Sequence, residues 1–161
     1  MHRCFIGIGS NLDDPISQVN RAVATLSKAK FTHHLISSSL YRSHPLAGLD
    51  QPDYINAVVA FDTSLTAHEL LSQLQNIENG QGRQRNTQRW SARTLDLDIL
   101  VYGDKVINDK DLTVPHYGIH ERNFVLLPLN EIAPDLLIPT LGIANELVTS
   151  IDTNTIDKLT N

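Results

Sequence analysis

The sequence predicts an α+β fold, in one domain spanning residues 1–161, with elements in the order β-α-β-β-α-β. Three kinds of observation predict it: apolar runs typical of strands, two segments with apolar residues at helical spacing, and turn residues between them. This order is that of the ferredoxin-like split βαβ arrangement, here with C-terminal additions. A chain of 161 residues is also long enough to bury a hydrophobic core.

The first strand is predicted at residues 4–9 (CFIGIG), followed by a turn at 10–14. A helix should begin next, because Asp14 is a favourable N-cap residue and Pro15 suits the first helical position. Apolar residues then recur with helical spacing through about Lys28. The N-terminal part therefore predicts one strand and one helix.

The second strand is predicted at 33–42 and the third at 54–62. The loop between them, at 43–53, contains two prolines and a glycine. Thr66 and Glu69 have the spacing of a capping box and should open a second helix. An Asn-Gly pair is expected to end that helix.

A polar segment at 79–94 leads to the fourth strand, predicted at 95–102. After it we expect a short hairpin near 105–107, a loop at 108–120 and a helix from about Arg122 to Glu131. A tail follows this helix.

The composition excludes several classes of protein. The net charge of −5 argues against a general nucleic-acid binder, which normally carries a basic surplus. The apolar runs are far shorter than the ~20 residues of a membrane span, and the N-terminus has no leader pattern. The single cysteine, Cys4, offers neither an internal disulfide nor a zinc site. We therefore expect a cytoplasmic protein that binds neither nucleic acid nor membrane.

The stretch 79–95 contains four arginines and no acidic residue. Arginine side chains match the oxygens of phosphate groups with two parallel hydrogen bonds, so the segment favours a polyphosphate ligand. A solvated loop with arginines that serve solubility would have the same composition. The arginines are Arg83, Arg85, Arg89 and Arg93.

The carboxylates of Asp96 and Asp98 should lie on one face of the fourth strand, about 7 Å apart along it. Such like charges repel unless a cation lies between them, and Mg²⁺ takes one or two protein carboxylates together with substrate phosphates. Two exposed aspartates on a solvated sheet face would show the same pattern. No Walker-type phosphate loop is present, and Gly7 and Gly9 are interpreted as accommodating the backbone.

Tyr54 and Asn56 should share a face at the start of the third strand. An aromatic ring can stack on a flat heterocycle while an amide recognises its edge. An edge tyrosine and a structural asparagine are the alternative interpretation.

The segment VPHYGIHERNF places histidine, tyrosine, arginine and phenylalanine together in a predicted loop, which suits contacts to a nucleotide or a ring. His116 and His120 would form a metal-binding pair only on a helix, and Pro115 and Gly118 argue against one. Glu78, at the end of the second helix, is expected to face the same region, although a surface carboxylate would fit equally.

Three segments together carry a family resemblance: DQPDYINA, GQGRQRNTQRWSARTLDLDILVYG and LTVPHYGIHERNFVLLPLNEIAP. They resemble the hydroxymethyldihydropterin pyrophosphokinase family of folate biosynthesis, over about residues 4–139. The resemblance implies a ferredoxin-like, often monomeric enzyme whose partners are small-molecule substrates. Its reaction is transfer of pyrophosphate from ATP to 6-hydroxymethyl-7,8-dihydropterin, leaving AMP. A catalytically inactive nucleotide- or pterin-binding module and a purely structural domain are the alternatives.

The resemblance also implies roles for the matching residues. Asp96 and Asp98 would hold two Mg²⁺ ions that bridge the ATP phosphates, and the catalytic arginines Arg83 and Arg93 would close over those phosphates. The implied pterin-binding residues are Ser43, Leu46, Tyr54, Asn56, Trp90 and Phe124. The implied ATP-binding residues are Gln75, Glu78, Arg85, Ile99, Thr113, His116, Tyr117 and Arg122.

Three places depart from the family pattern. Ser43-His44 stands where Thr-Pro is common, which implies a change in the pterin-side loop. Ser91-Ala92 replaces a Gly-Pro or similar pair and frees the backbone before Arg93, because a proline's fixed φ is absent. Asp111 stands where some members carry a basic residue, which implies the loss of one ATP contact.

Overall fold

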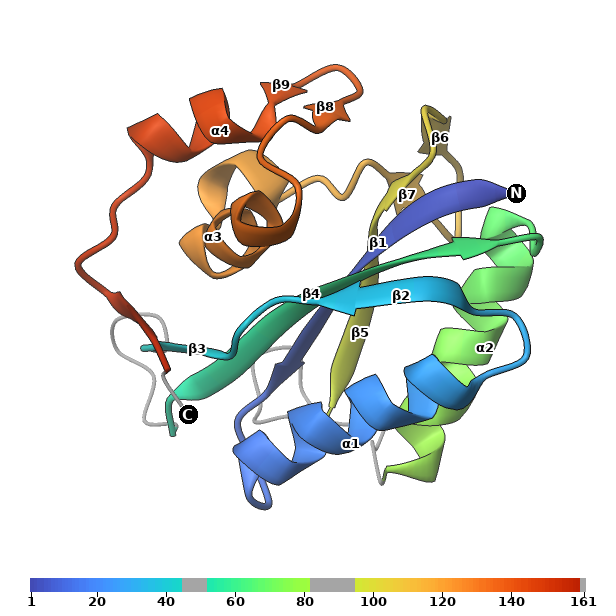
Figure 1. The fold of residues 1–161 in the computed structure, drawn as a ribbon, viewed down its shortest axis with the longest axis horizontal. Helices are drawn as coiled ribbons and strands as arrows, with labels where there is room; N and C mark the ends of the chain where they lie inside the picture. Colours follow the sequence, from blue (N-terminus) through green and yellow to red (C-terminus); the bar gives the residue numbers. More distant parts are fainter. Residues whose placement is uncertain (45–51, 82–94, 160–161) are drawn as a thin grey trace.

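A computed structural model describes residues 1–44, 52–81 and 95–159 of the chain (Figure 1). Its main sheet has the strand order β10-β3-β4-β1-β5, with β2 also paired to β4, and the pairings are antiparallel. The strands of this sheet are β1 (His2–Ser10), β2 (His33–Ser37), β3 (Tyr41–Ser43), β4 (Tyr54–Thr63), β5 (Asp96–Tyr102) and β10 (Ile156–Lys158).

The helices lie on both sides of this sheet (Figure 1). Two of them, α1 (Pro15–Lys28) and α2 (Ala67–Gly80), cover one face, and α3 (Asn123–Ile132) covers the other together with the short α4 (Ala144–Leu147). If β2 and β3 are counted as one strand, the order β5-β1-β4-β2/β3 is the 4-1-3-2 order of a ferredoxin-like sheet. The predicted α+β fold and its element order are confirmed.

The apolar residues form two cores, one on each side of the sheet. The larger packs β-strand side chains such as Ile6, Ile8 and Phe61 against α1 and α2. The second packs Phe5, Val58 and Leu100 against α3 and α4; we call this side the α3 face. Both faces of the central strands are therefore buried over most of their length, which explains the near-continuous apolar run of β4.

The predicted helix starts are correct in position. Thr66 and Glu69 form the capping box: the Thr66 hydroxyl accepts from the Glu69 N–H at 3.1 Å, and the Glu69 carboxylate accepts from the Thr66 N–H at 2.9 Å. Asp14 precedes α1 but does not cap it through its side chain. Its backbone is left-handed, with φ 61°, and its carboxylate accepts instead from the hydroxyl of Ser17 at 2.9 Å.

The prediction of one strand over 33–42 was wrong, because the chain leaves the sheet ladder between β2 and β3. The Ser38 hydroxyl accepts from the Val58 N–H at 3.0 Å, in the position that a strand carbonyl would occupy. The Ser39 N–H donates to the carboxylate of Glu131. Serine side chains compete with the backbone for such hydrogen bonds, and here they break the strand.

The second half differs in detail from the prediction. Helix α2 includes the Gly80 that was expected to end it, and α3 lies within one residue of its predicted bounds. The hairpin is formed by β6 (Ile107–Asn108) and β7 (Thr113–Val114) rather than near 105–107. The predicted loop 108–120 therefore contains β7 and the start of a 3-10 turn, η1 (Ile119–Glu121).

The tail after α3 contains further elements. It contains a second small hairpin, β8 (Leu137–Ile138) with β9 (Gly142–Ile143), then α4 and the 3-10 turn η2 (Val148–Ser150). Strand β10 then pairs with β3 and extends the sheet. Within β10 only Ile156 is buried, so its three residues carry almost no strand signal in the sequence.

Candidate active site

The two aspartates lie on the α3 face of the edge strand β5. Asp98 is paired with Gly7 of β1 and Asp96 with Gly9, and both aspartates are half-buried. The alternating residues Leu97 and Ile99 point the other way, into the core beneath α1 and α2. The predicted alternation along this strand is confirmed.

Residues at equivalent positions in four strands form a row across the sheet: Asp96 on β5, Gly9 on β1, Asn56 on β4 and Tyr41 on β3. Adjacent strands are about 4.8 Å apart, so Asp96 and Asn56 are separated by about 10 Å. A Cβ added at Gly9 would lie 3.1 Å from Asn56 Oδ1. The absence of a side chain at Gly9 therefore makes room for the Asn56 side chain, whose Oδ1 lies close to this position.

The side chain of Asn56 is buried and held in one orientation. Its Nδ2 donates to the Ser43 hydroxyl at 2.8 Å, and Ser43 is buried as well. Tyr54 is paired with Ser43 across β3 and β4 and is half-buried. Three of the residues expected to bind pterin thus lie together at one end of these two strands.

Aromatic and cationic groups from the segment after β7 form a continuous stack. The rings of His116 and Tyr117 lie 4.6 Å apart and 20° from parallel. The guanidinium of Arg122 lies 5.6 Å from the Tyr117 ring centre and 5.7 Å from that of Phe124. The stack therefore joins three predicted ATP-binding residues to a predicted pterin-binding one.

The imidazole of His116 is held neutral. Burial, together with the positive charge of Arg122, lowers its pKa from 6.5 to about 4, and the negative charge of Asp96 partly opposes this shift. Its Nδ1 accepts from the Gly118 N–H at 3.2 Å, so the ring proton is assigned to Nε2. Because the charge of Asp96 affects this pKa, the predicted metal ligand and the predicted ATP-binding histidine lie near each other.

Gly118 allows Arg122 to fold back over this stack, because an added Cβ would lie 2.6 Å from Arg122 Nε. His120 lies in η1 and pairs with its neighbour Glu121 at 3.5 Å. Within the described ranges, no group of three or more His, Cys, Asp or Glu side chains is arranged to hold a metal. Mg²⁺ commonly binds one or two protein carboxylates together with substrate phosphates and water, which suits a pair such as Asp96 and Asp98.

Three predicted ATP-binding residues lie on the other side of the sheet. Gln75 and Glu78 belong to α2, and the Ile99 side chain is buried in the core, so a contact from Ile99 would have to use its backbone. Glu78 is not a surface carboxylate: it is buried, and its Oε2 accepts from the Leu97 N–H at 2.8 Å. This hydrogen bond holds the backbone of β5 at Leu97, the residue between the two aspartates.

The remaining predicted residues lie either near β7 or outside the described part of the chain. Thr113 is exposed on β7, and Asp111 lies in the turn before it, where its N–H donates to Asp109. The departure at Ser91-Ala92 and five of the predicted site residues lie outside the described residues: Leu46, Arg83, Arg85, Trp90 and Arg93.

Two features were missed by the sequence reasoning. Asn11 is buried at the end of β1, and its Nδ2 donates to the Pro52 carbonyl at 3.3 Å, beside the predicted pterin-side loop. Glu131, near the end of α3, accepts a hydrogen bond from the Tyr41 hydroxyl at 2.7 Å. The sequence does contain a signal for the second, because Glu131 is the one charged residue in the apolar run NFVLLPLNEI.

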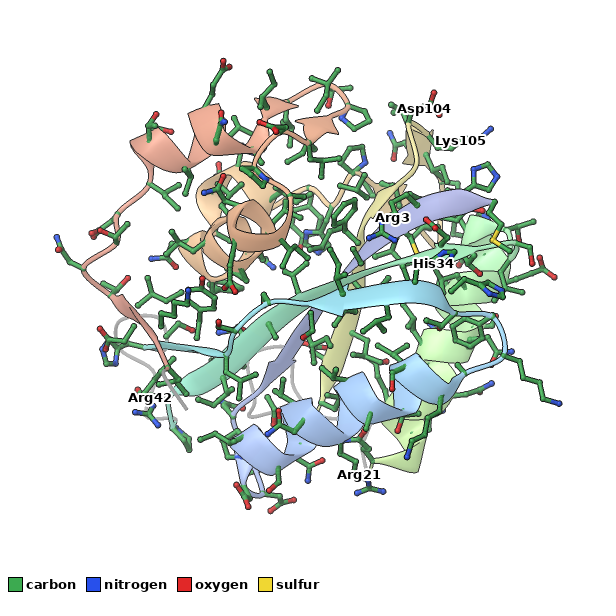
Figure 2. The ribbon with its side chains drawn as sticks, viewed as in Figure 1. Arg3, Arg21, His34, Arg42, Asp104 and Lys105 are labelled. Atoms are coloured by element: carbon green, nitrogen blue, oxygen red, sulfur yellow. The ribbon has the colours of Figure 1, made fainter. Side chains whose placement is uncertain are left out.

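A separate charged cluster lies near the start of β1, about 20 Å along the strand from Gly9. Figure 2 shows Arg3 and His34 close together there, and Arg3 Nη1 donates to the His34 carbonyl at 3.2 Å. Asp62 pairs with both side chains, at 3.3 Å and 3.2 Å. Arg21 lies on the α1 side of the sheet, also away from α3. The cluster of Arg3, His34 and Asp62 is therefore too distant to belong to the site on the α3 face.

The sequence of the chain is similar to those of named pyrophosphokinases. Residues 5–134 match the family model for 7,8-dihydro-6-hydroxymethylpterin-pyrophosphokinase. A 2-amino-4-hydroxy-6-hydroxymethyldihydropteridine pyrophosphokinase from Haemophilus influenzae is 49% identical over 148 residues, which cover 92% of each chain. The enzyme of the same name from Pseudomonas aeruginosa is 41% identical over 159 residues, covering 99% of this chain and 98% of the relative.

Solved structures agree on the fold. The wild-type HPPK-DHPS of Plasmodium falciparum, crystallised with pteroate, superposes with a TM-score of 0.72 at 15% identity, over 92% of this chain and 42% of that one. This chain therefore spans less than half the length of that protein. The matched residues, their high identity to two bacterial enzymes and the shared fold lead to one conclusion: the chain belongs to the 7,8-dihydro-6-hydroxymethylpterin-pyrophosphokinase family.

Proposed function

We propose that this chain transfers the diphosphate group of ATP to the hydroxymethyl oxygen of 6-hydroxymethyl-7,8-dihydropterin, a step of folate biosynthesis. The oxygen of the pterin hydroxyl attacks the β-phosphorus, the bond from that phosphorus to the oxygen of the α-phosphate breaks, and AMP leaves. Family membership supports the reaction. The arrangement of the site supports the assignment of a phosphate side and a pterin side.

One structural observation carries this assignment: the row from Asp96 through Gly9 to Asn56. It places carboxylates suited to a phosphate-bound cation about 10 Å from an amide suited to the edge of a heterocycle. The glycine between them has no side chain to separate the carboxylates from the amide. An isolated pair of solvated aspartates would not need an ordered, buried amide on the same face.

The donor set at Asp96 and Asp98 fits Mg²⁺, since hard cations prefer carboxylate oxygens and keep several sites for phosphate and water. We propose that these residues hold two such ions, which when bound would offset the charge of the ATP phosphates. The same face presents the Nε2–H of His116 as a neutral hydrogen-bond donor, and Arg122 as a fixed positive charge. These groups would bind and orient the nucleotide.

On the pterin side, we propose that Phe124 and Tyr54 enclose the ring while Asn56, held by Ser43, recognises its edge. Phosphoryl-type transfer depends mainly on positioning and on stabilising charge, and the chain offers rigid groups for both. The roles of Arg83 and Arg93 in closing over the phosphates stay predictions.

We further propose that residues 1–161 act as a single domain and as a monomer in the cytoplasm, with no nucleic-acid or membrane partner. Two core clusters on one continuous sheet support the single domain. In the part of the chain that the structure describes, none of the helices has the length and apolar character to cross a bilayer. Sedimentation of the purified protein measures its oligomeric state.

The proposed reaction is tested by incubating the protein with ATP, Mg²⁺ and 6-hydroxymethyl-7,8-dihydropterin and resolving the nucleotides by chromatography. AMP that forms only when pterin and Mg²⁺ are both present establishes diphosphate transfer. ADP would instead indicate an ordinary kinase. Unchanged ATP, with pterin binding retained, would indicate an inactive binding module.

A further inference from the structure

The carboxylate of Glu131 connects α3 to the strand that lies beside the proposed pterin site. Its Oε1 accepts from the Tyr41 hydroxyl at 2.7 Å, and its Oε2 accepts from the Ser39 hydroxyl and N–H, both at 3.0 Å. Lys158 of β10 lies 3.9 Å away. One side chain near the end of α3 is thus bonded to the segment leading into β3 and to β3 itself.

Tyr41 is the link from this carboxylate to the site. It is buried, and it is paired directly with Asn56 across β3 and β4. Ser43, which accepts from the Asn56 amide, lies two residues further along the same strand and on the same face. A displacement of Tyr41 would therefore move both the neighbour and the hydrogen-bond partner of Asn56.

The other end of α3 carries Phe124, so the helix bears one proposed wall of the pterin site near its start and Glu131 near its end. Apolar packing of Val125, Leu126 and Leu129 holds the helix on the sheet, but such packing is non-directional. Hydrogen bonds constrain position more sharply, because they weaken steeply when their geometry is changed.

We infer that Glu131 is a positioning residue for the pterin: through Tyr41 and Ser39 it sets the separation between Phe124 on α3 and Asn56 on β4. This inference rests on the proposed function. The carboxylate is ionised at neutral pH: burial would raise its pKa, but hydrogen bonds from Tyr41 and Ser39 outweigh that effect and lower it. An ionised carboxylate is also the group that can accept from three donors at once.

The test compares Glu131→Gln and Tyr41→Phe with wild type, measuring KM for the pterin, KM for ATP, kcat and the melting temperature. Glutamine keeps the size of the side chain but turns an NH₂ group toward donors. We expect KM for the pterin to rise about fivefold to tenfold in Glu131→Gln while KM for ATP stays within about twofold. Glu146→Gln, at an exposed position of α4, is the matched control and should change neither.

The double variant Glu131→Gln/Tyr41→Phe separates a shared effect from two independent ones. If both residues act through one contact, its KM for the pterin should be no higher than that of Glu131→Gln. A lowered melting temperature with unchanged KM for both substrates, or equal rises in both, would overturn the inference and leave Glu131 with a structural role. If Glu131→Gln does not fold, Tyr41→Phe, which removes one hydroxyl, decides the question alone. Failure of the proposed function would be seen separately, as absence of AMP with the wild-type protein.

Discussion

Replacement of Gly9 by alanine tests whether the position of the Asn56 amide beside Gly9 is needed for the pterin. The added Cβ would lie 3.1 Å from Asn56 Oδ1, whereas ordinary van der Waals contact begins at 3.4 Å. The Asn56 side chain must therefore move by about 0.3 Å. Asn56 is buried and its Nδ2 donates to the Ser43 hydroxyl at 2.8 Å. The movement therefore distorts this hydrogen bond.

The expected effects follow from these contacts. Overpacking by one methyl group should lower the free energy of unfolding by about 1 kcal/mol. Misplacement of the amide should cost one hydrogen bond to the pterin, about 1–1.5 kcal/mol, which corresponds to about a tenfold rise in KM for the pterin. KM for ATP should change little. Steady-state AMP release at varied pterin and varied ATP measures both constants, and urea unfolding measures the stability.

Two other glycines provide controls. A Cβ at Gly7, on the same strand and face, would lie 3.3 Å from Leu100, an apolar side chain that can shift, so Gly7→Ala should affect stability more than KM for the pterin. A Cβ at Gly80 would have no neighbour within 4 Å, so Gly80→Ala should change neither the KM for the pterin nor the KM for ATP. A Gly9→Ala enzyme whose KM for the pterin matches that of wild type would refute the role given to this row.

Three further outcomes are expected. Asp98→Asn should lower turnover more than about 100-fold while the melting temperature changes by only a few degrees; activity retained in the AMP assay would contradict the two-ion proposal. Between pH 6.5 and about 4 the unfolded chain protonates His116 while the folded chain does not, so the free energy of unfolding should fall as pH drops through this window. The full shift corresponds to about 3.4 kcal/mol, and partial exposure of the ring reduces it to about 1–2 kcal/mol. Urea unfolding of wild type and His116→Gln at pH 7, 5.5 and 4.5 measures the difference, and an equal dependence of the unfolding free energy on pH in the two proteins would count against it. Thr66→Ala should lower the free energy of unfolding by about 1 kcal/mol without changing either KM, because it removes only the cap that pairs with Glu69; a change in KM would show that α2 affects the site.

Features with a local cause were predictable from the sequence. The capping box of Thr66 and Glu69 requires only residues three apart, and the alternation of Asp96 and Asp98 follows from the geometry of one strand. The order of the elements follows from apolar periodicity. The strand break at Ser38 was not predictable, because it depends on a hydrogen bond to Val58 on another strand.

The site shows the same division. Several of its residue types were identified from the sequence, but the neutrality of His116 depends on burial and on Arg122. The contact of Glu131 with Tyr41 joins residues 90 positions apart. Neither follows from a pattern in one segment, since each needs groups that only the packed chain brings together.

By itself, the sequence determined the βαββαβ order and the two aspartates on one face, because residues close along the chain decide these features. Its resemblance also indicated the family to which the chain belongs. Only the tertiary structure decided that Asp96, Gly9, Asn56 and Tyr41 form one row, and that α3 lies over that face. The physical reason is that strand register and helix docking are set by burial of apolar surface between distant segments. The separation between the proposed phosphate and pterin sites follows from that packing.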